Sequence, residues 1–413
     1  MATVIGTSRA SSLQRFTSHV FRQSPRRLAA SNKKSFHTTK HLESRPRISF
    51  RIAASSSGKG RRFSLEKNFH NFDPSLQDAI GIQSSQNYLE RKSSRPDSGE
   101  DAFFVSKIGY DDNSFAFGVV DGVGGWTESG VDPADFSHAF CGHMAQSALE
   151  WESPAENLRA TALMQMGYEK TLADKTVFAG SSTACIGVAR PDGSVQLANL
   201  GDSGSLLFRL AAVHHYSVPQ THAFNSPYQL AVMPPLMRMQ TAMFGGKQYE
   251  DLPQDANITN CSVQHGDVLV LATDGVFDNL NNQDVLKLVT SRMMRTGAWH
   301  GTADMGISAT DKLDALTKPG GLGTVYQRSK RPKSQGIPSD TNNETELDRR
   351  TRGHTLQALL AVTIAGEAKI ASMDFRRDGP FAKEFHRYRP WDHWRGGKPD
   401  DICVVVLVAV EDK

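Results

Sequence analysis

Apolar residues along the chain fall into short runs that are typical of buried β-strands and into longer stretches that are typical of helices. The segment "TACIGVARPDGSVQLANLGDSGSLLFRL" (183–210) holds three strand-like runs. Its "PDG" predicts a tight hairpin, and therefore antiparallel pairing, between the first two. Further strands are predicted at "FAFGVV" (115–120), "VLVLA" (268–272) and "ICVVVLVAV" (402–410).

Helices are predicted between these runs. In "VDPADFSHAFCGHMAQSALEW" (131–151), Asp132 can cap a helix and Pro133 suits the first helical position, where a missing N–H costs nothing. Three more helical stretches follow, at 155–172, 281–295 and 355–373. The pattern therefore predicts a chain that mixes antiparallel sheet with helices.

The first 60 residues differ from the rest in composition. They are rich in Arg, Ser, Thr and Ala, and "SLQRFTSHVFRQSPRRLAA" (12–30) can form a basic amphipathic helix up to Pro25. Such a composition is typical of a mitochondrial transit peptide, and a disordered basic tail is the alternative. "ASSSGKGRR" (54–62) has the composition of a linker. We therefore expect a transit peptide and linker over 1–60 and a folded domain over 61–413.

Residues 296–354 also stand apart from their neighbours. They are rich in Gly, Thr, Lys, Arg and Asn and hold few large apolar residues. A segment of this length and composition predicts a disordered insertion within the domain. We expect its basic residues to be solvated.

Charge and cysteine content exclude several classes of protein. The first 60 residues hold 12 of the 47 basic and one of the 44 acidic residues, so the remainder has a net charge of −8 and shows no nucleic-acid footprint. No window reaches the ~18 apolar residues that a membrane-spanning helix needs. The four cysteines form no CxxC motif and lie in apolar contexts, which predicts buried free thiols in a reducing compartment.

Acidic residues recur at the margins of the predicted strands. They are Glu100, Asp101, Asp121, Asp202, Asp274, Asp278, Asp400 and Asp401. If the strands align, these carboxylates converge, and like charges that close require a counter-charge. Mg²⁺ and Mn²⁺ prefer such oxygen ligands. Gly122 follows Asp121 directly and, without a Cβ, lets the backbone approach an ion. Two cations bridged by a carboxylate suit the hydrolysis of a phosphoester by an activated water.

Six segments in order resemble the metal-dependent PPM (PP2C-type) serine/threonine protein phosphatases. They are "GEDAFF", "VVDGVGGW", "GSSTACIG", "LANLGDSG", "LATDGVFDN" and "KPDDICVVVL". "DGVGGWTESGVDPADFS" and "AFNSPYQL" are similar to the mitochondrial PTC7-type branch of that family. The resemblance covers about residues 70–295 and 355–413. It implies an α+β fold, a four-layer α-β-β-α sandwich of two antiparallel sheets flanked by helices.

The resemblance also implies catalytic roles. Asp121 would bridge two Mg²⁺ or Mn²⁺ ions, and the carbonyl of Gly122 would be a further ligand. Asp274 and Asp400 would complete the second ion, which makes Asp121, Asp274 and Asp400 the catalytic carboxylates.

The same resemblance implies roles for residues outside the set of catalytic carboxylates. Glu100 and Asp101 would hold waters bound to the ions. Asp202 and Asp278 resemble residues near a weaker third ion. Arg95 is the candidate for gripping the substrate phosphate, one residue out of the register usual in relatives. Many relatives have a histidine as general acid where this chain has Val123, so we predict that a metal-bound water protonates the leaving group.

Two other functions are open at this stage. "GDSGS" (201–205) also resembles the nucleophile segment of trypsin-like serine proteases, which would make Ser203 a nucleophile, but no stretch like that family's base histidine precedes it. A catalytically weak pseudophosphatase that acts as a binding protein is the second alternative. Val123 favours it, whereas the retained Asp121, Asp274 and Asp400 oppose it.

The sequence thus predicts a protein phosphatase of the mitochondrial matrix. It would act as a monomer on phosphoserine and phosphothreonine in mitochondrial proteins, without a nucleic-acid partner or a transmembrane segment. The histidines His138 and His143, five residues apart, are expected to pack rather than to bind metal.

Overall fold

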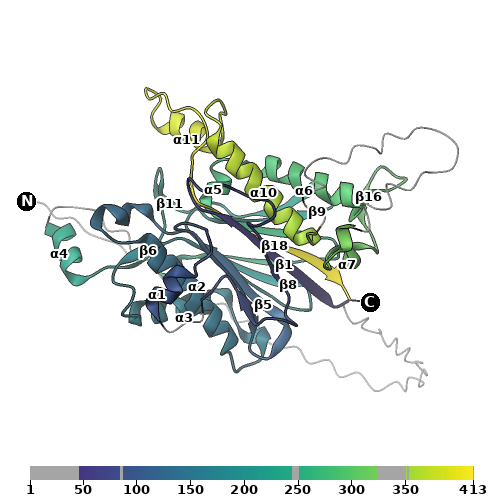
Figure 1. Ribbon diagram of the computed structural model, residues 1–413, viewed down its shortest axis with the longest axis horizontal. Coiled ribbons are helices and arrows are strands. Elements are labelled where there is room, and N and C mark those ends of the chain that lie inside the picture. Colours follow the sequence, from purple (N-terminus) through teal and green to yellow (C-terminus); the bar gives the residue numbers. More distant parts are fainter. Residues whose placement is uncertain (1–45, 84–86, 244–250, 324–349, 351–352, 413) are drawn as a thin grey trace, which may run out of the picture. The chain divides into compact units, whose positions relative to one another are not determined.

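Strand β18 (Ile402–Glu411), the longest apolar run of the sequence, lies inside the first of two six-stranded antiparallel sheets (Figure 1). The computed structural model describes residues 46–83, 87–243, 251–323, 350 and 353–412. In the first sheet the strand order is β10 (Ala212–Tyr216), β9 (Gly204–Arg209), β15 (Val268–Ala272), β18, β1 (Ile48–Ser57) and β2 (His70–Phe72).

The second sheet contains the hairpin that the sequence predicted. Its order is β14 (Asn257–Ser262), β8 (Ser194–Leu200), β7 (Ala184–Ala189), β5 (Asp111–Val120), β4 (Ala102–Ile108) and β3 (Ala79–Ile80). Strands β7 and β8 pair antiparallel around the "PDG" turn, as predicted. The third run of that segment, β9, instead crosses to the first sheet, and the crossing passes through Asp202.

Successive side chains of each strand point to opposite faces of its sheet. One apolar face of each sheet packs against the other sheet. In β18, Cys403, Val405 and Leu407 join the apolar cluster between the sheets, where Phe103 and Phe117 of the second sheet are fully buried. Ile402, Val404 and Val406 join a different cluster on the outer face. A strand that is apolar on both faces therefore requires cover on both sides.

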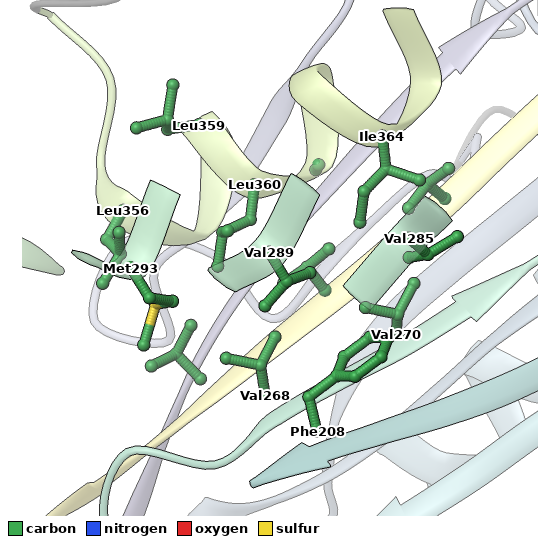
Figure 2. Packing of buried hydrophobic residues seen from close by; sticks show 14 of the residues in the cluster. Phe208, Val268, Val270, Val285, Val289, Met293, Leu356, Leu359, Leu360 and Ile364 are labelled. Atoms are coloured by element: carbon green, nitrogen blue, oxygen red, sulfur yellow. The ribbon is translucent and has the colours of Figure 1, made fainter. Parts of the chain in front are cut away.

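Helices supply that cover. Helices α2 (Pro133–Leu149) and α3 (Ala160–Ala173) pack on the outer face of the second sheet, and α6 (Asn282–Thr296) and α10 (Leu356–Met373) pack on that of the first (Figure 1). Figure 2 shows Leu360 and Ile364 of α10 beside Val285 and Val289 of α6, above Val270 of the sheet. The four-layer α-β-β-α architecture is thus as predicted.

The remaining described elements are short. They are α1 (Tyr88–Ser93), a 3₁₀ turn at Gly124–Ser129, another at Ala155–Asn157, β6 (Gly180–Ser182), β11 (Thr221–Ala223), β12 (Ser226–Pro227), β13 (Leu230–Val232), α4 (Pro235–Met243), a 3₁₀ turn at Pro253–Asp255, α5 (Asp274–Phe277), β16 (Trp299–Gly301), β17 (Ile307–Ala309), α7 (Leu313–Leu316) and α11 (Pro380–Tyr388).

The four predicted helices form close to their expected bounds. Asp132 caps α2 by accepting the N–H of Ala134 at 3.1 Å, and Pro133 takes the first position. Helix α10 is long and apolar enough to cross a membrane, although the sequence showed no such window. Since 83% of it is buried inside the protein, it is a core helix. All four cysteines are free, and Cys141, Cys185 and Cys403 are buried.

The predicted boundary at residue 60 is wrong. Residues assigned to a linker form β1, which pairs with β18 from Ile48 to Ser57. Ile52 and Ala54 join the cluster between the sheets, whereas the other face, including Ala53 and Ser55, is small and buried beneath α10. The small residues that resemble a linker in composition are those that let a helix approach the strand. Residues 1–45, which hold the predicted amphipathic helix, lie outside the described residues.

The predicted disorder of residues 296–354 is wrong for residues 299–316. Residues 299–316 form β16, β17 and α7, and Trp299 is fully buried, with its indole N–H donating to the carbonyl of Gly266 at 3.0 Å. Leu313 and Leu322 are buried as well. A few large side chains anchor this segment despite its polar composition. Residues 324–349 and 351–352 lie outside the described residues.

Candidate metal centre

Strand register brings acidic residues to one end of the sandwich. In the second sheet Ala102 pairs with Val120, so the neighbouring Asp101 and Asp121 lie side by side. In the first sheet Ala272 pairs with both Gly204 and Val404. Asp202 and Asp274 each lie two residues beyond their paired strand ends, and Asp400 lies two residues before the start of β18.

The structure places carboxylates of both sheets in one cluster. Oxygen atoms of Asp121, Asp202 and Asp274 lie within 4.8 Å of one another, a spacing at which they could hold one metal ion. Asp121 follows β5 of the second sheet, Asp274 follows β15 of the first, and Asp202 lies on the crossing between the sheets. Any cation bound here would tie the two sheets together.

Burial makes this cluster electrostatically costly. Burial, with Asp274 nearby, raises the pKa of Asp121 well above its usual value, and the same two causes raise the pKa of Asp202 to about 7. Burial and the neighbouring Asp401 raise the pKa of Glu100 to about 7 and that of Asp101 well above its usual range. These groups resist ionisation unless positive charge is supplied.

Lys398 supplies one such charge. Its ammonium Nζ lies 2.7 Å from Asp274 Oδ2, 2.6 Å from Asp278 Oδ2 and 3.1 Å from Asp400 Oδ2. Burial opposes ionisation of Asp274, but Lys398 holds the pKa of this carboxyl below its usual value. Burial likewise opposes the charge on the amine, but the three carboxylates raise the pKa of Lys398 well above its usual range. Burial and Asp274 still raise the pKa of Asp278.

No role was predicted for Lys398, or for Asn279, which holds the Lys398 backbone, although "KPDD" was among the motifs. Asn279 donates from Nδ2 to the carbonyls of Gly275 and Lys398, both at 2.9 Å, and accepts the Lys398 N–H at 2.9 Å. Gly275 is required here because a Cβ would lie 1.9 Å from the carbonyl oxygen of Asp401. A cation two residues before an Asp pair was the available signal.

Asp401 organises backbone at the rim of the cluster. Its carboxylate accepts the backbone N–H of Glu100 at 2.8 Å and that of Lys59. Gly99 has a φ of +70°, and a Cβ there would lie 2.0 Å from the Asp401 carboxylate. This carboxylate therefore fixes the loop that presents Glu100.

Thr273 holds two segments of the chain together inside the site. Its hydroxyl donates to Asp101 at 2.7 Å and accepts the N–H of Cys403 at 3.0 Å. One buried side chain thus links the carboxylate before β4 to the start of β18.

The loop after Asp121 passes close to its neighbours. Gly122 forms a bridge with Ser182, and a Cβ at Gly122 would lie 2.7 Å from the carbonyl oxygen of Glu100. The Val123 N–H donates to the Ser181 carbonyl at 3.0 Å, and the Trp126 indole donates to the Ser181 hydroxyl at 2.6 Å. The backbone path after Asp121 is therefore fixed, and glycine is required by close packing.

Arg95 is engaged elsewhere. Its guanidinium pairs with Asp135 at 2.6 Å and with Asp132 at 3.4 Å, both at the start of α2. Within the described residues, no ion pair joins Arg95 to Asp121, Asp202 or Asp274. The structure does not bring the expected phosphate-binding arginine into contact with the carboxylate cluster.

The protease alternative finds no support in the geometry. Ser203 is 1% exposed, and its hydroxyl bonds to Thr183 Oγ1 at 2.8 Å rather than to a histidine. His138 is buried in α2. Ser203 is a buried structural residue of the crossing between the sheets.

Comparison with known proteins gives the same family that the sequence motifs resemble. The protein phosphatase 2C family matches residues 92–313. The human "Protein phosphatase PTC7 homolog" is 38% identical over 190 residues, which cover 46% of this chain and 59% of that protein. The Drosophila simulans "Protein phosphatase PTC7 homolog fig" is 36% identical over 259 residues, which cover 62% of this chain and 73% of that protein. The chain spans 58% and 60% of the Drosophila grimshawi and Xenopus laevis relatives.

Solved structures show more distant similarity. The photosystem II phosphatase PBCP has a TM-score of 0.49 and 24% identity, and covers 78% of this chain and 94% of its own. The catalytic domain of the serine/threonine phosphatase PstP, in complex with two manganese ions, has a TM-score of 0.42 and 13% identity over 88% of this chain and 100% of its own. Because both TM-scores lie below 0.5, the sequence matches carry the comparison.

Proposed function

Since this chain belongs to the protein phosphatase 2C family, on its PTC7 branch, we propose that it hydrolyses phosphoserine and phosphothreonine in proteins with the help of Mg²⁺ or Mn²⁺. The observation that carries the proposal is the convergence of Asp121, Asp202 and Asp274 from different strands, with oxygen atoms within 4.8 Å of one another.

The donor set fits a hard divalent cation. All side-chain donors of the cluster are carboxylate oxygens, the ligands that Mg²⁺ and Mn²⁺ prefer. Asp202 Oδ1 is buried and has no hydrogen-bond partner within the described residues. Burial and Asp274 raise the pKa of Asp202 to about 7, so this oxygen requires positive charge nearby. A cation would satisfy both the orphaned oxygen and the repulsion.

We assign the ligands residue by residue. Asp121 would be shared between two ions, with the Gly122 carbonyl beside it. Asp274 and Asp400 would complete the set from the first sheet. When bound, the ions would activate a water for attack on phosphorus and neutralise charge on the phosphate.

The remaining carboxylates would act from outside that set. Glu100, held by Asp401, and Asp101, held by Thr273, would orient waters at the rim. Val123 offers no proton, so no side chain at this position acts as general acid. Arg95 is already paired with Asp135, and we assign it no contact with the phosphate.

The proposed substrates are mitochondrial phosphoproteins. The support is the composition of the first 45 residues, which are basic, hold one acidic residue and are typical of a transit peptide. We propose a location in the matrix on the same ground.

Phosphate release from a phosphothreonine peptide tests the activity. We expect the full-length chain to turn over with Mn²⁺ and not with EDTA, and Asp121→Asn to lose about 10³-fold in turnover, since losing a shared ligand removes several kcal/mol of transition-state stabilisation. Asp112→Asn is the matched control, because Asp112 lies at the other end of β5 and its side chain is exposed.

Three results would contradict the proposal. They are turnover by wild type in EDTA, unchanged turnover in Asp121→Asn, and binding of Mn²⁺ by wild type without any turnover. The last result would favour the non-catalytic pseudophosphatase. Circular dichroism of Asp121→Asn separates a catalytic loss from a loss of fold.

A further inference from the structure

The ammonium group of Lys398 lies inside the carboxylate cluster rather than at its rim. It is within 3.1 Å of Asp274, Asp278 and Asp400, and only 17% of its side chain is exposed. Lysine is strongly hydrated and rarely buried unless it is paired, so three carboxylate partners mark a specific site.

The position of this group is fixed from several directions. Asn279, which is fully buried, clamps the Lys398 backbone through both its amide N–H and its carbonyl. The Phe381 ring lies beneath the ammonium, with its centroid 5.2 Å from Nζ. The Phe381 N–H in turn donates to the carbonyl of Asp278 at 3.0 Å. The lysine is therefore held in place by α11 and by the segment after α5.

The same oxygens cannot serve a metal ion at the same time. A divalent cation shared by Asp274 and Asp278 would lie roughly 2.1 Å from its ligand oxygens. Lys398 Nζ already lies 2.7 Å and 2.6 Å from the Oδ2 atoms of these two residues. An ion in the space that the ammonium fills between these two oxygens is therefore excluded by steric overlap and by repulsion between like charges.

We propose that Lys398 is a built-in cation of this centre, whose ammonium takes the place at Asp274 and Asp278 that a further divalent ion would otherwise occupy. The inference depends on the proposed function, because it assumes that Asp121, Asp274 and Asp400 bind divalent cations through oxygens other than the Oδ2 atoms that face Lys398. It replaces the weaker third ion at Asp278 by a side chain of the protein, whereas Asp202, which lies with Asp121 and Asp274, stays a ligand of the remaining ions. The centre then carries one permanent positive charge in the absence of metal.

Mn²⁺ titration by calorimetry and thermal unfolding in chelator test this inference on the full-length chain. We expect Lys398→Met to bind one more Mn²⁺ than wild type, or to bind its weakest ion at least about tenfold more tightly. In chelator the same variant should unfold at a lower temperature, because the carboxylates lose their counter-charge. Lys398→Arg keeps the charge and should retain the wild-type number of ions.

Lys59→Met is the matched control. Lys59 Nζ also faces Asp400, at 3.7 Å, but its side chain is 61% exposed. Its removal should change neither the number of ions bound nor the unfolding temperature in chelator.

Each outcome separates this inference from the proposed function. If wild type binds Mn²⁺ and hydrolyses phosphopeptide while Lys398→Met binds the same number of ions with equal or weaker affinity, only the role of Lys398 is overturned. If no protein binds Mn²⁺, both proposals fail. If Lys398→Met folds only with Mn²⁺ whereas wild type and Lys398→Arg fold without it, the built-in cation is supported.

Discussion

His138 shows how burial of a single residue can set a pH dependence. It lies in α2 with 4% of its surface exposed, and burial lowers the pKa of its ring to about 3. In the unfolded chain a histidine takes up a proton near pH 6.5, whereas the folded protein keeps this ring neutral. Stability from the neutral ring is therefore complete above pH 6.5 and is lost as the pH falls toward 3.

Replacing this ring should flatten the acid side of the stability profile. We expect the free energy of unfolding of wild type to fall by about 1 kcal/mol more than that of His138→Phe between pH 8 and pH 5.5. Urea denaturation at both pH values measures the difference. His393→Phe, at an exposed position, should follow wild type. Parallel profiles for wild type and His138→Phe would show that His138 does not contribute.

For single residues, the sequence predicted which acidic side chains form the cluster but not that Lys398 contacts them. Asp121, Asp202 and Asp274 could be found because each follows an apolar run, and aligned strands bring their ends together. Lys398 could not be assigned in this way. Its contacts with Asp274 and Asp278 join segments that lie 124 and 120 residues apart, and only the fold brings them together.

Elements were predictable where local chemistry defines them. Asp132 and Pro133 define the start of α2, and Asn281 caps α6 by accepting two backbone N–H groups. Strand β1 was missed although Ile48, Phe50 and Ile52 alternate with polar residues, because the small residues 53–57 that follow resemble a linker and their burial depends on α10. The segment at 299–316 was missed because a single large anchor, Trp299, outweighs its polar composition.

The corrected boundary gives a prediction about truncation. A protein that begins at Pro46 keeps β1, so we expect it to fold and to unfold cooperatively. A protein that begins at Arg61 leaves one edge of β18 unpaired and removes Ile52 from the core, so we expect it to aggregate or not to fold. Size-exclusion chromatography and circular dichroism distinguish the two. A soluble, folded protein starting at Arg61 would show that β1 is dispensable.

At the scale of the whole molecule, the two sheets meet at one charged centre. Asp121 belongs to the second sheet and Asp274 to the first, and Asp202 lies where the chain passes between them. Function therefore requires both halves of the sandwich in register. The family resemblance predicted this architecture, whereas the hydrophobic pattern alone predicted only its antiparallel hairpin and its helices.

The mitochondrial location of the whole molecule is a separate prediction. A fluorescent protein fused behind residues 1–45 should accumulate in mitochondria, because a basic amphipathic helix is what such signals present. Replacing Arg15, Arg22, Arg26 and Arg27 by glutamine should leave the fusion in the cytosol. Microscopy with a mitochondrial dye measures both. Equal distribution of the two fusions would favour the alternative of a basic tail without a targeting role.

The pairing of β1 with β18 has a consequence for how the chain comes into being. Ribosomes make β1 early and its partner β18 near the end, so the first sheet cannot close while most of the chain is being made. Pairing across so long a stretch of sequence is also intrinsically slow. A newly made chain therefore stays open until residues 402–411 are free. Such an open chain is the form that import into mitochondria, as proposed above, would require.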